Sequence, residues 1–218
     1  GKGKIVDVLA GNYPVVARFQ GGPNAGHSLH FEGKSFVLRS VPSGIFRQDA
    51  INIVGNGVVL DPITFKGECD NIAKTGIPVT KRIVIAKKAH LILPTHRLLD
   101  AANEAAMGKS KIGSTLKGIG PTYTDKIGRY GLRVGDILAA DFEERYAKLQ
   151  NRHITLLNQM GFECDPHAED AAFMEAVNFL KEFELVDCEY YINDLLKDNE
   201  ILAEGAQGSM LDIDYGSY

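Results

Sequence analysis

Short apolar runs rich in β-branched residues recur along the chain, each bounded by glycine, proline or polar residues. Such runs are typical of buried strands, because branched side chains pack well on a pleated surface. A turn at Glu32-Gly33 separates two alternating runs, which predicts a hairpin over residues 29–41. The predicted strands cover residues 15–19, 51–54, 82–86 and 200–203, with short apolar pieces at 58–60 and 91–93.

Longer segments carry apolar residues at helical spacing and predict helices between the strands. Asp61 followed by Pro62 is a typical helix start, with a capping carboxylate and a proline in the first turn. Residues 108–128 are polar, rich in glycine and without period, so they predict a long loop. The predicted helices cover residues 1–10, 62–74, 95–107, 141–160 and 168–183, and a further one ends at Leu196.

Strands that alternate with helices predict an α/β fold with a largely parallel central sheet flanked by helices. We expect a helical subregion near residues 141–198. The chain has 218 residues, of which 44% are hydrophobic, so it can bury a substantial core. We therefore expect residues 1–218 to form a single α/β domain, or a large part of one.

Charge and cysteine content narrow the possible functions. The formal net charge is −4, which argues against non-specific nucleic-acid or membrane binding, so phosphate recognition must be local. No apolar run approaches the ~20 residues that span a bilayer, and no secretory leader is visible. Three cysteines without metal-ligand spacing predict reduced thiols in a cytoplasmic protein, and the six histidines show no zinc-like pairs.

Four glycine-rich turns are the strongest functional signal in the residues themselves. They lie at residues 1–4, 21–26, 118–121 and 204–208, and two of them follow predicted strands. A single such turn is usually a tight surface turn. Four of them suggest a site that cradles a polyanion, since glycine lets backbone N–H groups approach phosphate closely. Together with the alternating fold, they indicate a P-loop-like nucleotide-binding architecture.

Several polar residues beside these turns could carry chemistry. Lys2 and Lys4 suit a phosphate, although a solvated basic terminus has the same pattern. His27 could act as a general acid, or be an exposed turn histidine. Thr115 and Gln207 offer a hydroxyl and an amide to a ligand. Lys117, Arg129 and Arg133 suit a phosphate monoester, while surface ion pairs are the commoner role of arginine.

Taken in order, the motifs resemble the adenylosuccinate synthase family, whose GTP-dependent members join IMP and aspartate on the route to AMP. The resemblance covers essentially the whole chain and corresponds to the N-terminal half of the family without its first residues. The motifs are Gly-Lys-Gly-Lys at 1–4, Arg-Phe-Gln-Gly-Gly-Pro-Asn-Ala-Gly-His at 18–27, Pro-Ser-Gly-Ile at 42–45, Gly-Asn-Gly-Val-Val-Leu at 55–60, Gly-Ile-Gly-Pro-Thr-Tyr-Thr-Asp-Lys at 118–126, Gly-Leu-Arg-Val-Gly-Asp at 131–136 and Glu-Gly-Ala-Gln-Gly at 204–208.

The resemblance implies a role for individual residues. His27 would be the general acid, with Lys2 and Gln207 also catalytic, and Gly26 would give its carbonyl to Mg²⁺. Arg129 would reach the IMP phosphate of the partner subunit, which implies a homodimer. The implied GTP-binding residues are Gly1, Lys2, Gly3, Lys4, Gly26, His27 and Ser28, and the implied IMP-binding residues are Lys2, Asn24, Ala25, Gly26, His27, Thr115, Arg129 and Gln207.

One departure from the family pattern makes a structural prediction. The family has a glycine where this chain has Leu116. If that position needs a positive φ, the leucine backbone is strained there.

Two other functions are compatible with the residues. An inactive remnant could keep an IMP and phosphate pocket without turnover. A GTPase-like switch is a third reading, although Lys4 is followed by Ile5 rather than by serine or threonine.

Overall fold

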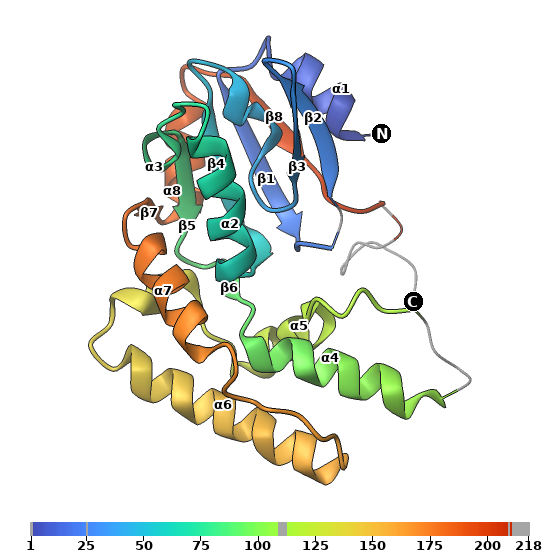
Figure 1. Cartoon of the computed structure of the whole chain (residues 1–218). Helices are drawn as coiled ribbons and strands as arrows, with labels where there is room; N and C mark the ends of the chain where they lie inside the picture. Colours follow the sequence, from blue (N-terminus) through green and yellow to red (C-terminus); the bar gives the residue numbers. More distant parts are fainter. Residues whose placement is uncertain (1, 25, 109–112, 209, 211–218) are drawn as a thin grey trace.

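The structure is a computed structural model that describes residues 2–24, 26–108, 113–208 and 210, with residues 2–4 described by their backbone alone. Its centre is a parallel sheet in the strand order β7-β5-β4-β1-β8, with β6 paired to β4 (Figure 1). The predicted α/β fold with a largely parallel sheet is confirmed. The strands are β1 Val15–Gly21, β4 Ile51–Leu60, β5 Ile83–Ala86, β6 His90–Leu91, β7 Glu184–Val186 and β8 Ile201–Glu204.

A separate antiparallel hairpin lies beside the sheet, formed by β2 (His27–Phe31) and β3 (Lys34–Leu38). Its turn places Glu32 and Gly33 at φ values of 48° and 75°. Two consecutive residues with positive φ suit a tight hairpin whose strands twist to the right. The predicted hairpin is confirmed, and its first strand begins directly at His27.

Helices cover both the sheet and each other (Figure 1). Helix α2 begins as predicted, because the Asp61 carboxylate accepts the backbone N–H groups of Ile63 at 3.0 Å and Thr64 at 3.2 Å. Helix α2 packs against α7, and α4 packs against α5 and α6. The helices are α1 Lys2–Leu9, α2 Pro62–Ala73, α3 Val79–Arg82, α4 Pro94–Ala106, α5 Ile119–Gly128, α6 Phe142–Gln159, α7 Asp170–Leu180 and α8 Cys188–Leu195, with 3₁₀ turns η1 Ser43–Phe46 and η3 Val134–Leu138.

The long loop predicted over residues 108–128 is wrong in its second half, where α5 forms. The segment has weak helix propensity, so its helix depends on tertiary contacts rather than on local sequence. Gly118 precedes it with a φ of 72°, and a Cβ there would lie 2.9 Å from the backbone of Arg97. Asp125 then ties the helix to the buried His96 and His153.

The strand predicted at residues 51–54 also continues further than expected, through two glycines to Leu60. A Cβ at Gly57 would lie 2.5 Å from the carbonyl oxygen of Phe19 on β1. Here the β1–β4 register shifts between Arg18 and Gln20. Glycine therefore marks a close approach of two strands at a bulge, not the end of one.

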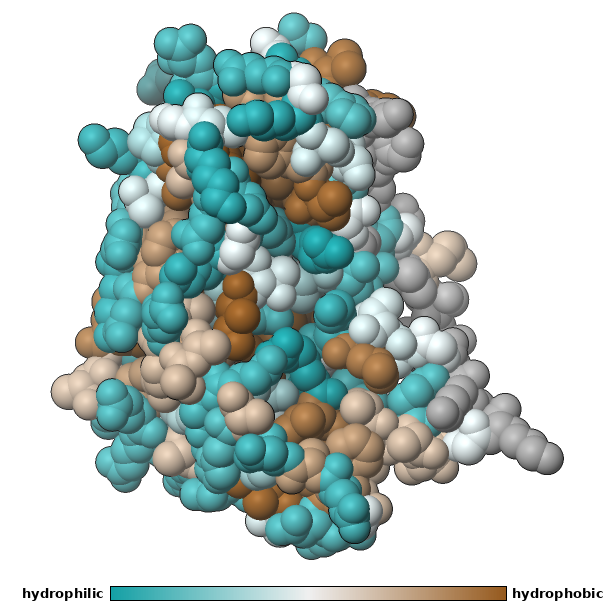
Figure 2. Space-filling view, viewed as in Figure 1, coloured by the Kyte–Doolittle hydropathy of each residue, from teal (hydrophilic) through white to brown (hydrophobic). Residues whose placement is uncertain are grey.

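The core lies where the sheet and the helices meet. Phe65 of α2 and Phe173 of α7 are fully buried in it. Near the end of α6, Leu156 and Met160 are 38% and 40% exposed. The face seen in Figure 2 is mostly hydrophilic, with hydrophobic side chains gathered in small patches. Within the described part of the chain, no helix has both the length and the apolar character that a membrane span needs.

Candidate active site

The candidate site begins where β1 and β8 end side by side. The two strands are parallel, with Arg18 opposite Glu204, so the turns that follow them leave from the same edge of the sheet. Gln207 Nε2 donates a hydrogen bond to Asn24 Oδ1 across that edge at 2.6 Å. Two residues predicted to bind IMP, 183 positions apart, are thus in direct contact.

His27 stands at the start of β2, in the same neighbourhood. Its Nε2 lies 2.7 Å from the hydroxyl of Ser43, which donates to Glu204 Oε1 at 2.9 Å. The backbone N–H of Ser43 donates to the other carboxylate oxygen of Glu204 at 2.8 Å. The His27 side chain is 19% exposed, so the ring sits between this network and solvent. Sequence reasoning assigned no role to Ser43 or Glu204, although both lie within motifs that it noted.

Burial and charge act in opposite directions on these groups. Desolvation lowers the pKa of His27, Glu204 opposes the effect and Arg18 adds to it. The pKa of the buried Arg18 is also lowered by desolvation, which Glu204 and Glu68 oppose. Neutral imidazole is therefore the form of His27 that the protein favours.

The structure describes only some of the other residues that were predicted to bind GTP. Gly26 and Ser28 flank His27 and are exposed. The backbone of residues 2–4 opens α1, which packs against β2 and η1, the elements that carry His27 and Ser43. Gly1 and Ala25 lie outside the described residues, as do the side chains of Lys2 and Lys4.

Helix α5 links the candidate site to Thr115 and Arg129. Ile119 at its start packs on Gly22, where a Cβ would meet the isoleucine at 2.9 Å, so α5 begins at the turn that follows β1. Thr115 precedes this end and is exposed. Arg129 caps the opposite end with a φ of 62°, roughly 15 Å away along a helix of this length. The two residues therefore do not act at one point.

Leu116 has a φ of 55°, and the predicted backbone strain at this position is confirmed. A left-handed conformation costs a residue with a Cβ roughly 1–2 kcal/mol. The strain falls directly beside Thr115. Such strain is common at ligand-binding segments, where the surrounding structure maintains it.

Arg129 lines a basic groove of about 400 Å³ with Tyr130, Arg145, Lys148 and Arg152. Arg145 donates to Asp136 at 2.9 Å, and the Arg152 guanidinium lies 3.8 Å from the centre of the Tyr130 ring. The groove carries more positive than negative charge. It suits an anion such as a phosphate monoester.

Two buried histidines meet a carboxylate elsewhere, although their sequence spacing predicted no cluster. His96, Asp125 and His153 each bring a possible ligand atom within 4.8 Å of the others. The Leu93 N–H donates to His96 Nδ1 at 2.9 Å, so the proton of that ring is on Nε2 and is donated to Asp125 at 3.0 Å. His153 Nε2 is 2.8 Å from the same oxygen.

This cluster is a hydrogen-bond network rather than a metal centre. A metal-binding histidine usually donates its second ring N–H to an acceptor, whereas His96 Nδ1 accepts one. Its Nε2 would have to lose a proton before it could bind an ion. Burial lowers the pKa of His96 to about 4, which keeps the ring neutral.

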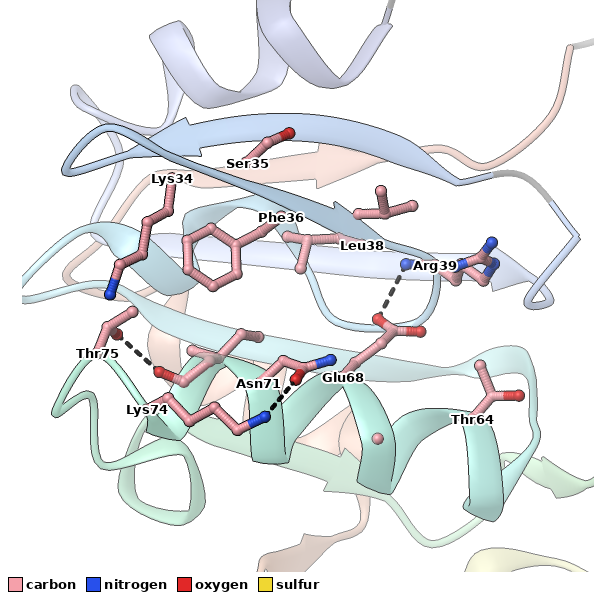
Figure 3. A pocket seen from close by; sticks show the side chains of 13 residues that line it. Lys34, Ser35, Phe36, Leu38, Arg39, Thr64, Glu68, Asn71, Lys74 and Thr75 are labelled. Atoms are coloured by element: carbon pink, nitrogen blue, oxygen red, sulfur yellow. Dashed lines mark hydrogen bonds between the residues drawn. The ribbon is translucent and has the colours of Figure 1, made fainter.

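A cavity of about 670 Å³ lies between β3 and α2 (Figure 3). Glu68 at its wall accepts the backbone N–H groups of Arg39, Ser40 and Val41 at 2.9 to 3.2 Å. These bonds use the carboxylate to hold the segment that leads into η1. None of the predicted site residues lines the cavity.

A parallel α/β sheet with polar side chains gathered at the ends of its strands defines a nucleotide-binding α/β protein. The chain belongs to the adenylosuccinate synthetase family, whose model matches residues 1–218. It is 59% identical to adenylosuccinate synthetase of Parabacteroides distasonis over 100% of this chain and 52% of that protein. The value is 60% for the Porphyromonas gingivalis protein, again with 52% of its length covered. The chain thus spans about half the length of the curated relatives it matches.

Two solved structures resemble the fold. Fully ligated adenylosuccinate synthetase from Plasmodium falciparum matches with a TM-score of 0.86 and 32% identity, covering 100% of this chain and 51% of that chain. Succinoaminodeoxyadenylate synthetase of cyanophage S-2L, bound to dGMP and dATP, matches with a TM-score of 0.63 and 25% identity over the same shares.

Proposed function

We propose that this chain is the nucleotide-binding half of an adenylosuccinate synthetase, which joins IMP and L-aspartate at the expense of GTP in AMP biosynthesis. The family match over residues 1–218 carries this proposal. The meeting of Asn24, Gln207 and the His27 network at the ends of β1 and β8 supports it, because IMP and GTP need converging polar groups.

The proposed reaction has two steps. IMP O6 attacks the γ-phosphorus of GTP as the N1 proton passes to a base, and GDP leaves. The aspartate amine then attacks C6 and loses a proton, and phosphate leaves with O6. The products are adenylosuccinate, GDP and phosphate. Charge builds on the departing GDP in the first step, where a general acid is most effective.

His27 is the proposed general acid, because its half-buried ring reaches the site edge with Nε2 already in a hydrogen-bond network. Asn24 and Gln207 orient each other, and their amides suit the donor and acceptor pattern of the hypoxanthine base. Lys2, with the backbone of residues 1–4, is proposed to hold phosphate oxygens at the start of α1. Ser28, Ala25 and Thr115 complete the proposed nucleotide contacts.

Mg²⁺ fits this proposal through the carbonyl of Gly26, an exposed residue beside His27, because Mg²⁺ prefers oxygen ligands. Nucleotide phosphates and water supply most ligands of Mg²⁺ in such sites. The ion would neutralise charge on the phosphates. The His96 cluster is unsuited to it, because two protonated ring nitrogens occupy the shared carboxylate oxygen.

We also propose a homodimer in the cytoplasm. Arg129 lies at the end of α5 away from the β1 turn, in a basic groove that would serve the IMP phosphate of a neighbouring subunit. All three cysteines are free, with Cys69 and Cys188 buried, as is usual in reducing compartments.

The decisive experiment measures adenylosuccinate formation by an enzyme of the relatives' full length that carries this sequence. We expect turnover only when IMP, GTP, aspartate and Mg²⁺ are all present. Binding of IMP without turnover would favour an inactive remnant, and phosphate release with GTP alone would favour a GTPase-like switch. Replacing IMP and GTP by dGMP and dATP, the nucleotides in the cyanophage structure, tests specificity and should give little product.

A further inference from the structure

Ser43 and Glu204 have no part in the proposed reaction, yet they join His27 in one hydrogen-bond relay. The relay runs from the Glu204 carboxylate through the Ser43 hydroxyl, at 2.9 Å, to His27 Nε2, at 2.7 Å. The direct distance from His27 Nε2 to Glu204 Oε1 is 3.8 Å, so the hydroxyl is the real link.

The carboxylate end of the relay is held rigidly. Glu204 is 4% exposed at the end of β8 and accepts two hydrogen bonds from Ser43, one from the backbone N–H and one from the hydroxyl. Arg18 is paired with it in register on β1, so both side chains lie on the same face of the sheet. The Arg18 guanidinium and the Glu204 carboxylate attract each other there.

The serine end is held by close packing. A Cβ at Gly44 would lie 2.6 Å from Val16 Cγ2 and 2.8 Å from Asn52 Oδ1, so η1 rests directly on β1 and β4. Arg47, which follows η1, donates to the carboxylate of Asp7 on α1 at 2.8 Å. The Pro42-Ser43-Gly44 motif therefore fixes one hydroxyl between the sheet and α1.

The direction of the hydrogen bonds decides where the histidine proton lies. A hydroxyl has one proton, and the ionised Glu204 can only accept it. Ser43 Oγ then has only lone pairs to offer His27, so His27 Nε2 must be the protonated nitrogen. A general acid that acts through Nε2 needs its proton on that nitrogen, and an oxygen of the departing GDP must then replace Ser43 Oγ as the acceptor of that proton.

We propose that Ser43 and Glu204 are positioning residues that fix the Nε2–H tautomer and the orientation of the His27 ring. The relay itself stands on the described contacts, whereas its value for catalysis rests on the proposed function. Among the described residues, the charged groups that act on His27 are Glu204 of β8, Arg18 of β1 and Asp7 of α1.

The substitution Glu204→Gln tests the relay because it should reverse its direction. The Ser43 backbone N–H requires an acceptor, so the glutamine oxygen takes that place and its NH₂ group faces the Ser43 hydroxyl. The hydroxyl then accepts from the amide and donates its own proton to His27. The His27 ring must then switch to the Nδ1–H form, with Nε2 as the acceptor.

The ¹⁵N chemical shifts of the two His27 ring nitrogens report this directly, in the protein without nucleotide. We expect Nε2–H in the unmodified protein and a change to Nδ1–H in Glu204→Gln. Asp61→Asn is the control, since Asp61 is also a buried carboxylate but binds Ile63 and Thr64 of α2 and does not touch the relay. A Nδ1–H ring in the unmodified protein, an unchanged tautomer in Glu204→Gln, or the same change in Asp61→Asn would each overturn the proposal.

Kinetics at the relatives' full length provide a second measurement. We expect Glu204→Gln to lower kcat by about 10²-fold with little change in KM for IMP, and Asp61→Asn to leave kcat unchanged. The loss should shrink as pH falls, because imidazolium carries protons on both nitrogens. A loss that is constant with pH would indicate a structural role and contradict the proposal. If even the unmodified enzyme is inactive, the proposed function fails, while the tautomer measurement still decides the relay.

Discussion

The two histidine–carboxylate networks of this protein use the same groups in opposite ways. In the helical region, Asp125 accepts from His96 and His153 directly, and both rings are fully buried. At the end of the sheet, Glu204 reaches His27 only through a hydroxyl, and that ring is 19% exposed. One network joins three helices and the other holds a single ring at the surface.

This difference shows how to distinguish a histidine with a structural role from one that can take part in a reaction. In the helical cluster both ring nitrogens have partners, with the Leu93 N–H on His96 Nδ1 and Thr95 Oγ1 at 2.7 Å from His153 Nδ1. Neither ring can turn without leaving a buried polar group unpaired. His27 has a strong partner on one nitrogen and solvent nearby, so a ligand can compete for it. The hydrogen-bond partners of the ring nitrogens and the access of the ring to solvent distinguish His27 from the buried histidines, whereas residue type does not.

The largest expected effect is kinetic and concerns His27. His27→Ala at the relatives' full length should lower kcat by about 10²–10⁴-fold, as for loss of a general acid, with IMP affinity largely kept. Steady-state turnover and IMP titration check this. His30→Ala, an exposed position on the same strand, is the control and should retain activity. An unchanged kcat in His27→Ala would show that His27 is not the general acid.

The next effect is on stability and concerns Asp125. Asp125→Ala leaves two buried N–H donors without an acceptor, so we expect a loss of roughly 3 kcal/mol in the free energy of unfolding. Urea unfolding followed by circular dichroism measures it. Asp70→Ala removes an exposed carboxylate paired with Lys66, and its loss should be far smaller because solvent screens that pair. Equal losses in Asp125→Ala and Asp70→Ala would show that the buried cluster does not stabilise the fold more than a surface ion pair.

The pH dependence of the free energy of unfolding should reflect the lowered pKa of the buried His96 ring. Burial lowers the pKa of His96 from 6.5 to about 4 in the folded state, so the unfolded chain binds more protons between these values. The stability contributed by neutral His96 is present above about pH 6.5 and is lost as pH falls towards 4. We expect His96 alone to contribute a loss of about 2 kcal/mol at pH 5 relative to pH 8, and His90, whose pKa is also lowered to about 4, to add to it. Urea midpoints across this range test it, and His96→Gln should make the curve less steep without removing the contribution of His90.

The smallest expected effect concerns backbone strain. The described non-glycine residues with positive φ are Glu32 in the hairpin turn and Leu116, Arg129 and Gln207, which lie in or beside predicted site segments. Leu116→Gly should stabilise the fold by roughly 0.5–1 kcal/mol, because the leucine is 44% exposed and little burial is lost. Thermal unfolding checks the sign. Destabilisation would mean that the side chain contributes more than its strained backbone costs.

Sequence alone determined the features that depend on neighbouring residues. The β-branched runs, the Asp61 cap and the Glu32-Gly33 turn predicted most strands, a helix start and a hairpin, because their physical causes lie within a few residues. The motifs were sufficient to identify the family, and a glycine position occupied by Leu116 predicted strain that the backbone has.

Tertiary structure alone decided the features that depend on residues far apart. Helix α5 forms in a segment without a helical pattern, because packing on Gly22 and the hydrogen bonds that Asp125 accepts from His96 and His153 stabilise what propensity does not. The same holds for both histidine networks, since Ser43 and Glu204 are 161 positions apart and meet only through strand pairing. Sequence spacing carries no signal for such contacts, because the sheet register and the packing of helices create them.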